Sequence, residues 1–136
     1  MTEPPKNDNW HEVETYKSLM QYGASLLRFV LWANGGGAVA LLTFAGNISS
    51  KTGQALDMRW PMMCFLAGVL AGGLATLSSY YTQLTLYRED VNGEEHSSAI
   101  THEFWLRVSL VLVLAGLVAF ASASILAVVS IAPRTS

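Results

Sequence analysis

Cysteine is nearly absent from this chain, which contains only Cys64 among its 136 residues. A single cysteine excludes an intrachain disulfide, a zinc site built from several cysteines and a dithiol redox pair. Because Cys64 also lies within a long apolar stretch, we interpret it as a small packing residue.

Charged residues are scarce as well, since they make up only 13% of the chain, about half the share that is usual in soluble domains. The net charge of -2 provides no basic surface for nucleic acid, so we expect no partner of that class. The few charges are also segregated. They lie mainly in the tails and loops, and Arg28 is the only charged residue within the three apolar stretches that separate them.

These apolar stretches cover residues 26–44, 60–81 and 108–131. A bilayer core about 30 Å thick needs roughly 20 helical residues to cross it, and each stretch meets that length. We therefore predict an all-α fold, an integral membrane three-helix bundle whose helices extend beyond the bilayer on the N-terminal side. The predicted spans are about 24–46, 60–83 and 105–131, within a membrane domain of residues 23–132.

The segments outside the spans are short. We predict a disordered tail at residues 1–9, an amphipathic lead-in helix at 10–22, a polar turn at 47–57 and a second tail at 133–136. The lead-in helix has apolar residues at helical spacing and can run unbroken into the first span; these residues are Trp10, Val13, Tyr16, Leu19 and Met20. We expect it to meet the end of the second helix and the start of the third in a small bundle outside the membrane.

Lysine and arginine counts near the spans predict the orientation. The N-terminal side carries Lys6, Lys17, Arg28, Arg88 and Arg107, and the other side carries Lys51, Arg59 and Arg134. This excess favours a cytoplasmic N-terminus.

Small residues recur along each span at intervals that allow close helix packing. The second span has Cys64, Gly68, Gly72, Ala75 and Ser79, the third has Ala115, Ala119, Ala123 and Ala127, and the first has Gly36 and Ala40. Two interpretations stay open. The small residues pack the three helices against one another, or they also mediate self-association.

The tetrapeptide Asn34-Gly35-Gly36-Gly37 lies near the middle of the first span, where glycine is a poor helix former and a buried amide needs a partner. In one interpretation Asn34 bonds another helix, at Thr76 or Ser78, and the glycines admit that helix. In the other, the segment is locally unwound and lines a pore or binding site.

Several residues fall where membrane-interface anchors belong. These candidates are Arg28, Trp60, Tyr80, Tyr81, Trp105 and Arg107. Arg28 lies one turn inside the first span, with Trp32 four residues on. We expect its guanidinium to extend towards the headgroups with a cation–π contact to Trp32.

The sequence contains no pattern typical of catalysis. It has no nucleophile–base pair, no glycine-rich phosphate loop and no HExxH motif. All three histidines lie outside the spans, where they would not hold a haem between helices. We therefore predict no enzymatic activity, no cofactor and no metal site.

The run Leu31–Asn47 contains Asn-Gly-Gly, one further glycine and then Ala-Val-Ala-Leu-Leu-Thr-Phe-Ala-Gly-Asn. This run resembles the first span of uncharacterised small bacterial three-span inner-membrane proteins. The resemblance implies a location in the bacterial inner membrane and brings no activity with it.

Two functional hypotheses follow. The first is a non-enzymatic membrane protein that self-associates through small-residue helix faces, with a pore-forming or membrane-perturbing role of the defence or lysis type as its specific form. The alternative is an accessory or scaffold subunit of a larger membrane complex, bound through the cytoplasmic helical extension. The expected partners are the lipid bilayer and either further copies of the chain or other membrane subunits.

Overall fold

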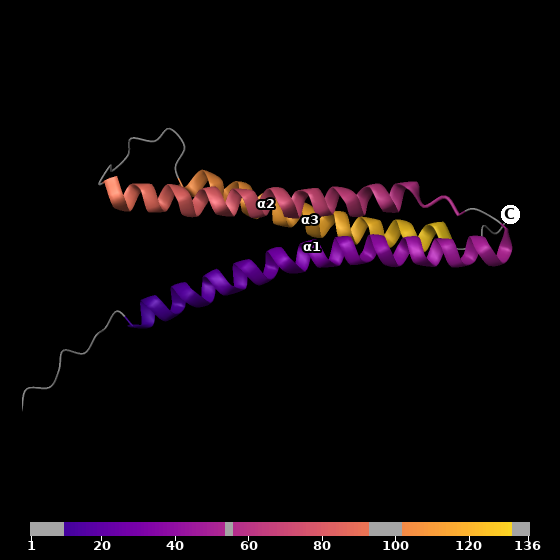
Figure 1. Cartoon of the computed structure of the whole chain (residues 1–136), viewed down its shortest axis with the longest axis horizontal. Coiled ribbons are helices and arrows are strands. Elements are labelled where there is room, and N and C mark those ends of the chain that lie inside the picture. The colour runs from indigo at the N-terminus through magenta and orange to yellow at the C-terminus, as the bar shows by residue number, and fades with distance from the viewer. Residues whose placement is uncertain (1–9, 54–55, 93–101, 132–136) are drawn as a thin grey trace, which may run out of the picture.

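The computed structural model describes residues 10–53, 56–92 and 102–131. They form three helices, α1 (Trp10–Thr52), α2 (Arg59–Asn92) and α3 (His102–Ile131), and the described part of the chain contains no strand (Figure 1). Each helix is long and apolar enough to cross a membrane. The predicted all-α three-helix fold is confirmed, and the chain has the helices of a multi-pass membrane protein. The tails predicted at 1–9 and 133–136 lie outside the described residues.

The helices alternate in direction, so α1 and α3 run parallel and α2 runs opposite to both (Figure 1). Helices α2 and α3 pack against each other more extensively than either packs against α1. Helix α1 crosses this pair at an angle, and its N-terminal third leans away from them.

A seven-residue repeat places the contacts on one face of each helix. Seven residues turn an α-helix through 700°, about 20° short of two full turns, so residues at this spacing stay in one row. The interior rows are Leu27, Asn34 and Leu41 on α1, Pro61, Gly68 and Ala75 on α2, and Ser109, Gly116 and Ala123 on α3. This repeat is typical of left-handed helix bundles.

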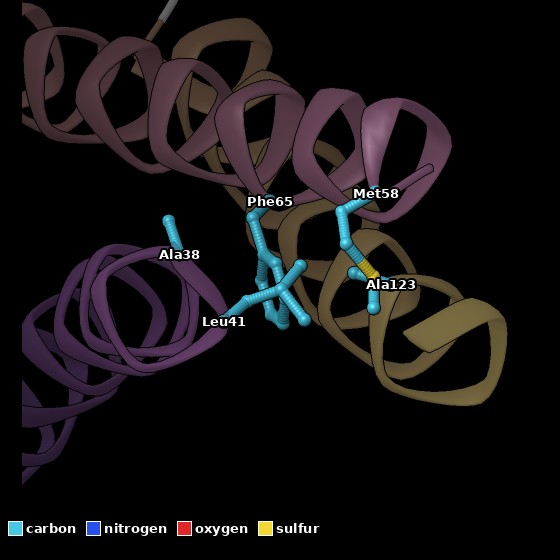
Figure 2. Close-up of a cluster of buried hydrophobic side chains, with 5 residues drawn as sticks. All are labelled: Ala38, Leu41, Met58, Phe65 and Ala123. Carbon is cyan, nitrogen blue, oxygen red and sulfur yellow. The ribbon is translucent and has the colours of Figure 1, made fainter. Parts of the chain in front are cut away.

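Two clusters of buried apolar side chains lie along this seam. The larger one joins Ala38 and Leu41 of α1 to Phe65 of α2 and Ala123 of α3, with Met58 beside them (Figure 2). The smaller cluster joins Val30, Ala75 and Val113, which also come from the three helices. Asn34 lies between the two clusters along α1.

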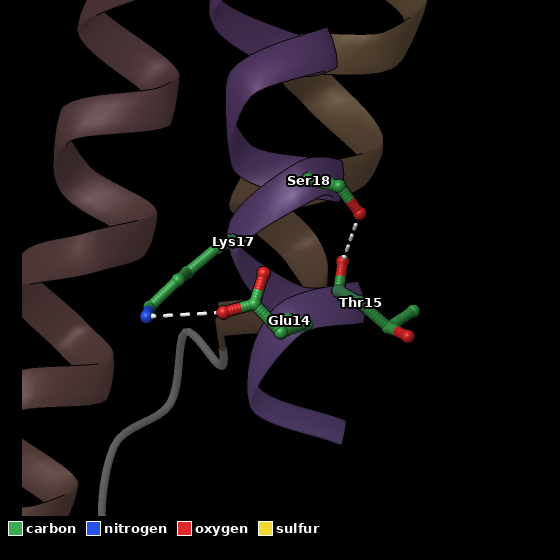
Figure 3. A network of polar contacts seen from close by, with 4 residues as sticks. All are labelled: Glu14, Thr15, Lys17 and Ser18. Atoms are coloured by element: carbon green, nitrogen blue, oxygen red, sulfur yellow. Dashed lines mark hydrogen bonds and ion pairs between the residues drawn. The ribbon is translucent and has the colours of Figure 1, made fainter. Parts of the chain in front are cut away.

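The lead-in helix and the first span form one continuous helix, as the sequence allowed. Its N-terminal part, Trp10–Leu26, is here called the arm. All the described apolar side chains of the arm are exposed, and no arm residue belongs to either cluster. Its polar contacts are local, because Lys17 pairs with Glu14 at 3.6 Å and the Ser18 hydroxyl donates to the Thr15 carbonyl (Figure 3).

The prediction that the arm joins a bundle outside the membrane is therefore wrong. Only α2 and α3 stay together at that end, where the rings of Tyr81 and Trp105 stack with centroids 5.0 Å apart. The reason is geometric. Because α1 is a continuous helix that crosses the α2–α3 pair at an angle, the contact it makes around Asn34 is lost before the arm begins.

Helix α1 continues to Thr52, so the polar turn predicted from Asn47 is wrong over its first six residues. The helix ends where Gly53 adopts a left-handed φ of 67° and its N–H donates to the Ser49 carbonyl at 2.9 Å. This geometry is the αL C-cap, which glycine adopts without the steric cost of a Cβ. The polar residues before Gly53 contain no helix breaker, so the helix does not stop earlier.

Helix α2 begins with a side-chain cap and a proline. The N–H of Arg59 donates to Asp57 Oδ1 at 3.3 Å, and Pro61 lies buried in the first turn, where the sequence placed it. A proline there removes no intrahelical hydrogen bond.

Gly53→Ala should lower the free energy of unfolding by about 1–2 kcal/mol, because an L-residue with a Cβ is strained at this φ. Gly46→Ala is the matched control, since it also adds a methyl group to open space but in the interior of α1. There it should be neutral or slightly stabilising. Both are measured by titrating SDS into mixed micelles and following helix content by circular dichroism. Equal effects at the two positions would contradict the cap.

Candidate functional site

Asn34 is the largest polar side chain that is fully enclosed in the described structure, with 0% of its surface exposed. Its amide nitrogen, Nδ2, donates to the Val30 carbonyl at 2.9 Å and to the Gly116 carbonyl at 3.1 Å. The first bond lies within α1 and the second reaches α3. Asn34 therefore ties α1 to α3 at membrane depth.

Helix α2 approaches the same side chain through Gly68. A Cβ built on Gly68 would overlap the carboxamide of Asn34, and a Cβ on Gly116 would meet Val30. The Gly68 carbonyl lies only 3.5 Å from that second Cβ position. The carboxamide of Asn34 thus occupies the space that the missing side chain of Gly68 leaves open, and Val30 occupies the space beside Gly116. We call Asn34, Gly68 and Gly116 the Asn34 junction.

Two further glycines extend this close approach. A Cβ on Gly72 would lie 2.9 Å from Leu31 Cδ2, and a Cβ on Gly37 would overlap the ring of Phe65. Phe65 in turn packs against Phe120, with ring centroids 6.0 Å apart at 58°. Since apolar surfaces gain little by associating in lipid, this close packing of side chains against glycines is a main source of helix association.

The carbonyl oxygen of Asn34, Oδ1, is buried and has no hydrogen-bond donor in the described part of the chain. An α-helix uses its own backbone N–H groups internally, so the neighbouring helices offer none. Oδ1 instead lies against Gly68. Glycine α-carbon hydrogens are weak donors to such an oxygen at helix–helix contacts.

Both earlier interpretations of this segment need correction. Asn34 bonds another helix, but its partner is the backbone of α3 rather than Thr76 or Ser78 of α2; the Thr76 hydroxyl donates to the Gly72 carbonyl of its own helix. The locally unwound alternative is wrong, because α1 is helical from Trp10 to Thr52. The surrounding helices supply the packing that offsets the poor helix propensity of the glycines.

The predicted stripe of α2 lies in the interior of the bundle. Gly68, Gly72 and Ala75 are buried, whereas Cys64 and Ser79 are half-buried. Ser79 and Ser109 share a hydrogen bond of 2.9 Å between their hydroxyls, and Ser109 lies 3.2 Å from the Ala75 carbonyl.

The alanine ladder of α3 does not form one face. Ala123 is buried, Ala119 and Ala127 are half-buried, and Ala115 is exposed. Four residues advance a helix by 400°, so each step drifts about 40° around the axis. Over the ladder this drift carries one end out of the interior.

In α1, Gly36 and Ala40 are exposed and point away from the other two helices. A Cβ built on Gly35 or on Gly36 would meet no atom within 4 Å. Of the glycines at 35–37, only Gly37 contacts another helix.

Sequence reasoning missed Gly116, Phe65 and Ser109 as members of the interior. Gly116 had a usable signal, because it is the only glycine in the third apolar stretch and lies seven residues from both Ser109 and Ala123. Phe65 had the same kind of signal, because it lies seven residues before Gly72 of the predicted stripe.

The candidate interface anchors lie towards the two ends of the bundle. Trp60, Tyr80, Tyr81 and Arg107 are exposed, and Trp105 is half-buried against Tyr81. Arg28 and Trp32 are both exposed on α1 but form no cation–π contact, so that expectation is wrong.

No group of three His, Cys, Asp or Glu side chains in the described residues is placed to hold a metal ion. Comparison with known proteins finds no matching family model, no similar curated protein and no similar solved structure.

Gly68→Ala should lower the free energy of unfolding in micelles by about 1–3 kcal/mol, because the added methyl group overlaps the enclosed carboxamide of Asn34. Gly73→Ala is the control on the same helix, where the methyl group meets open space. The double variant Asn34→Ala/Gly68→Ala should recover part of the loss, which gives a coupling energy between the two sites. Additive effects of the two substitutions would contradict the junction.

Proposed function

We propose that the chain is a non-enzymatic membrane protein that self-associates through the side of α1 that its own bundle leaves uncovered. The observation that carries this proposal is a second seven-residue repeat on α1. One row consists of Ala33, Ala40 and Asn47. The other consists of Gly36, Thr43 and Ser50. All six are exposed except Ala33, which is half-buried, and we call them the outer α1 face.

The outer α1 face differs from an ordinary lipid-facing surface. The corresponding outward row of α3 consists of Val111, Val118 and Ile125, which are 64%, 65% and 64% exposed. Large aliphatic side chains of this kind suit acyl chains. Small side chains over several turns instead leave a shallow groove, into which the backbone of another helix fits.

The proposed contact is between copies of the chain in the same orientation. Copies inserted the same way are related by an axis along the membrane normal, so identical faces of two α1 helices meet across a twofold axis. At one end of the face, the exposed amide of Asn47 can donate to the same amide of the second copy. Such an interhelical bond contributes on the order of 1 kcal/mol.

The specific form of the proposal is a pore-forming or membrane-perturbing assembly in a bacterial inner membrane, with the arm in the cytoplasm. Its support is the outer α1 face together with the lysine and arginine distribution. Dye release from liposomes during reconstitution tests this form separately from association. If the protein forms dimers or larger assemblies but the liposomes release no dye, the pore hypothesis is excluded and the self-association hypothesis is retained.

In a cysteine-free Cys64→Ala background, Ala40→Cys should form an intermolecular disulfide upon oxidation in membranes, because this position faces its counterpart across the proposed contact. Val118→Cys on α3 is the matched control, since that position is also exposed but lies outside the outer α1 face. The readout is the fraction of dimer on non-reducing gels. Equal cross-linking at both positions would show only random collision.

Gly36→Leu should convert the assembly to monomer, because a large side chain fills the proposed groove. Gly73→Leu is the control, since Gly73 of α2 also has open space beside it but lies outside the outer α1 face. Mass photometry or analytical ultracentrifugation in detergent measures the molecular mass. A wild-type protein that is monomeric in both detergent and nanodiscs would overturn the proposal.

The exposed arm favours one second candidate, an accessory subunit bound to a larger membrane complex. The described apolar side chains of the arm are exposed, so a partner protein that packs against its apolar side would remove them from water. Val13 and Met20 lie seven residues apart on that side and are 50% and 41% exposed.

Val13→Glu/Met20→Glu should then release proteins that co-purify with the wild type from native membranes. Thr15→Glu/Ser18→Glu, on the polar side of the arm, is the control that should retain them. Purification of the wild-type protein with no companion would exclude this candidate.

A further inference from the structure

Arg28 is the only charged residue within the three apolar stretches, and its depth in the membrane can be placed against aromatic residues at the bundle ends. On α2, Trp60 and Tyr81 are separated by about 31 Å of helix at 1.5 Å per residue, which matches a hydrocarbon core of about 30 Å. Asn34 contacts Gly68, which lies about 20 Å of helix before Tyr81. Arg28 lies only about 9 Å from Asn34 towards that end. Its Cα is therefore roughly 10 Å inside the level of Tyr81.

The charge of Arg28 is not compensated by the described part of the chain. Arg59 lies 3.7 Å from Asp57 and Arg107 lies 3.6 Å from Glu103, so each of these two arginines has a carboxylate partner. Arg28 makes no ion pair, hydrogen bond or ring contact with a described residue. A guanidinium at this depth is costly unless it meets an anion or water.

The surface beside Arg28 offers open space and an exposed aromatic ring. Gly35 follows Arg28 by seven residues on the same row of α1, towards the bilayer centre, and the space beside its α-carbon is open. Trp32 lies between them along the helix and is 79% exposed. The guanidinium of Arg28 would therefore lie at the level of a phospholipid headgroup. The open space at Gly35, which we call the notch, and the ring of Trp32 would lie at the level of its acyl chains.

We infer that Arg28, Trp32 and Gly35 form a binding site for an anionic phospholipid of the leaflet at the arm end of α1. The guanidinium extends towards the headgroups and binds the lipid phosphate with two parallel hydrogen bonds. One acyl chain descends along Trp32 and over Gly35. Arg28 and Gly35 lie about 80–100° around α1 from Gly36, and Trp32 lies about 40° from it, so the guanidinium and the open space at Gly35 lie outside the outer α1 face.

The site is tested by native mass spectrometry of the full chain in neutral detergent with equal concentrations of phosphatidylglycerol and phosphatidylcholine. The wild type should retain phosphatidylglycerol preferentially. Arg28→Gln should lower the ratio of bound phosphatidylglycerol to phosphatidylcholine about fivefold. Arg28→Lys should give an intermediate ratio, since it keeps the charge and loses the planar fork.

Three further variants separate the site from other effects. Arg107→Gln, which removes an exposed arginine at the bundle end, should leave the ratio unchanged. Gly35→Leu should reduce bound phosphatidylglycerol with the guanidinium intact, because the leucine fills the notch. Gly36→Leu should keep the lipid even where it abolishes self-association.

Either of two results would overturn the site: an equal lipid ratio for Arg28→Gln and the wild type, or an equal loss for Arg107→Gln and Arg28→Gln. If Arg28→Gln does not fold, the site is tested with the wild-type protein alone, by the effect of each lipid on its Tm. Phosphatidylglycerol should then raise its Tm in detergent and phosphatidylcholine should not, and equal shifts would overturn the site.

Discussion

The close approach of three helix backbones around the carboxamide of Asn34 is the contact on which the bundle depends. Lipid is as apolar as leucine, so burying apolar side chains does little to hold membrane helices together. Packing and interhelical hydrogen bonds must do so instead. The junction combines both, because the missing side chains at Gly68 and Gly116 bring the backbones near enough for Asn34 to reach a carbonyl of α3. The junction therefore sets the level at which α1 lies against the other two helices.

Helix α1 has two opposite faces, one that packs inside the bundle and one that faces its surroundings. Its interior row, with Asn34 at the centre, belongs to the bundle of a single chain. Two residues further on, at Gly36, the helix has turned by about 200° and presents a surface of small side chains to its surroundings. The outward row of α3, built from valine and isoleucine, has no such surface. This asymmetry within one small bundle is the observation on which the proposed contact between α1 helices of different copies rests.

Most charged residues of this chain lie where the dielectric constant is high, outside the apolar stretches. The described ion pairs lie on the arm and at the bundle ends, where water and headgroups solvate them and each contributes little to stability. Arg28 differs because it lies deeper and has no such partner. The same low dielectric that makes its isolation costly makes a lipid phosphate an effective counter-ion, which links a single residue to the composition of the membrane.

Length and apolar composition were sufficient to predict three membrane-crossing helices, because a chain in hydrocarbon must satisfy its backbone hydrogen bonds within each span. Local chemistry also placed Pro61 in the first turn of α2. The partner of Asn34, the exposure of Ala115 and the separation of the arm were decided only by the tertiary structure. Each depends on the rotation and crossing of whole helices, and a difference of 40° around an axis changes an interior alanine into a lipid-facing one. In apolar solvent the hydrophobic pattern does not encode that rotation, since both faces of a membrane helix are apolar and only contacts between distant residues distinguish them.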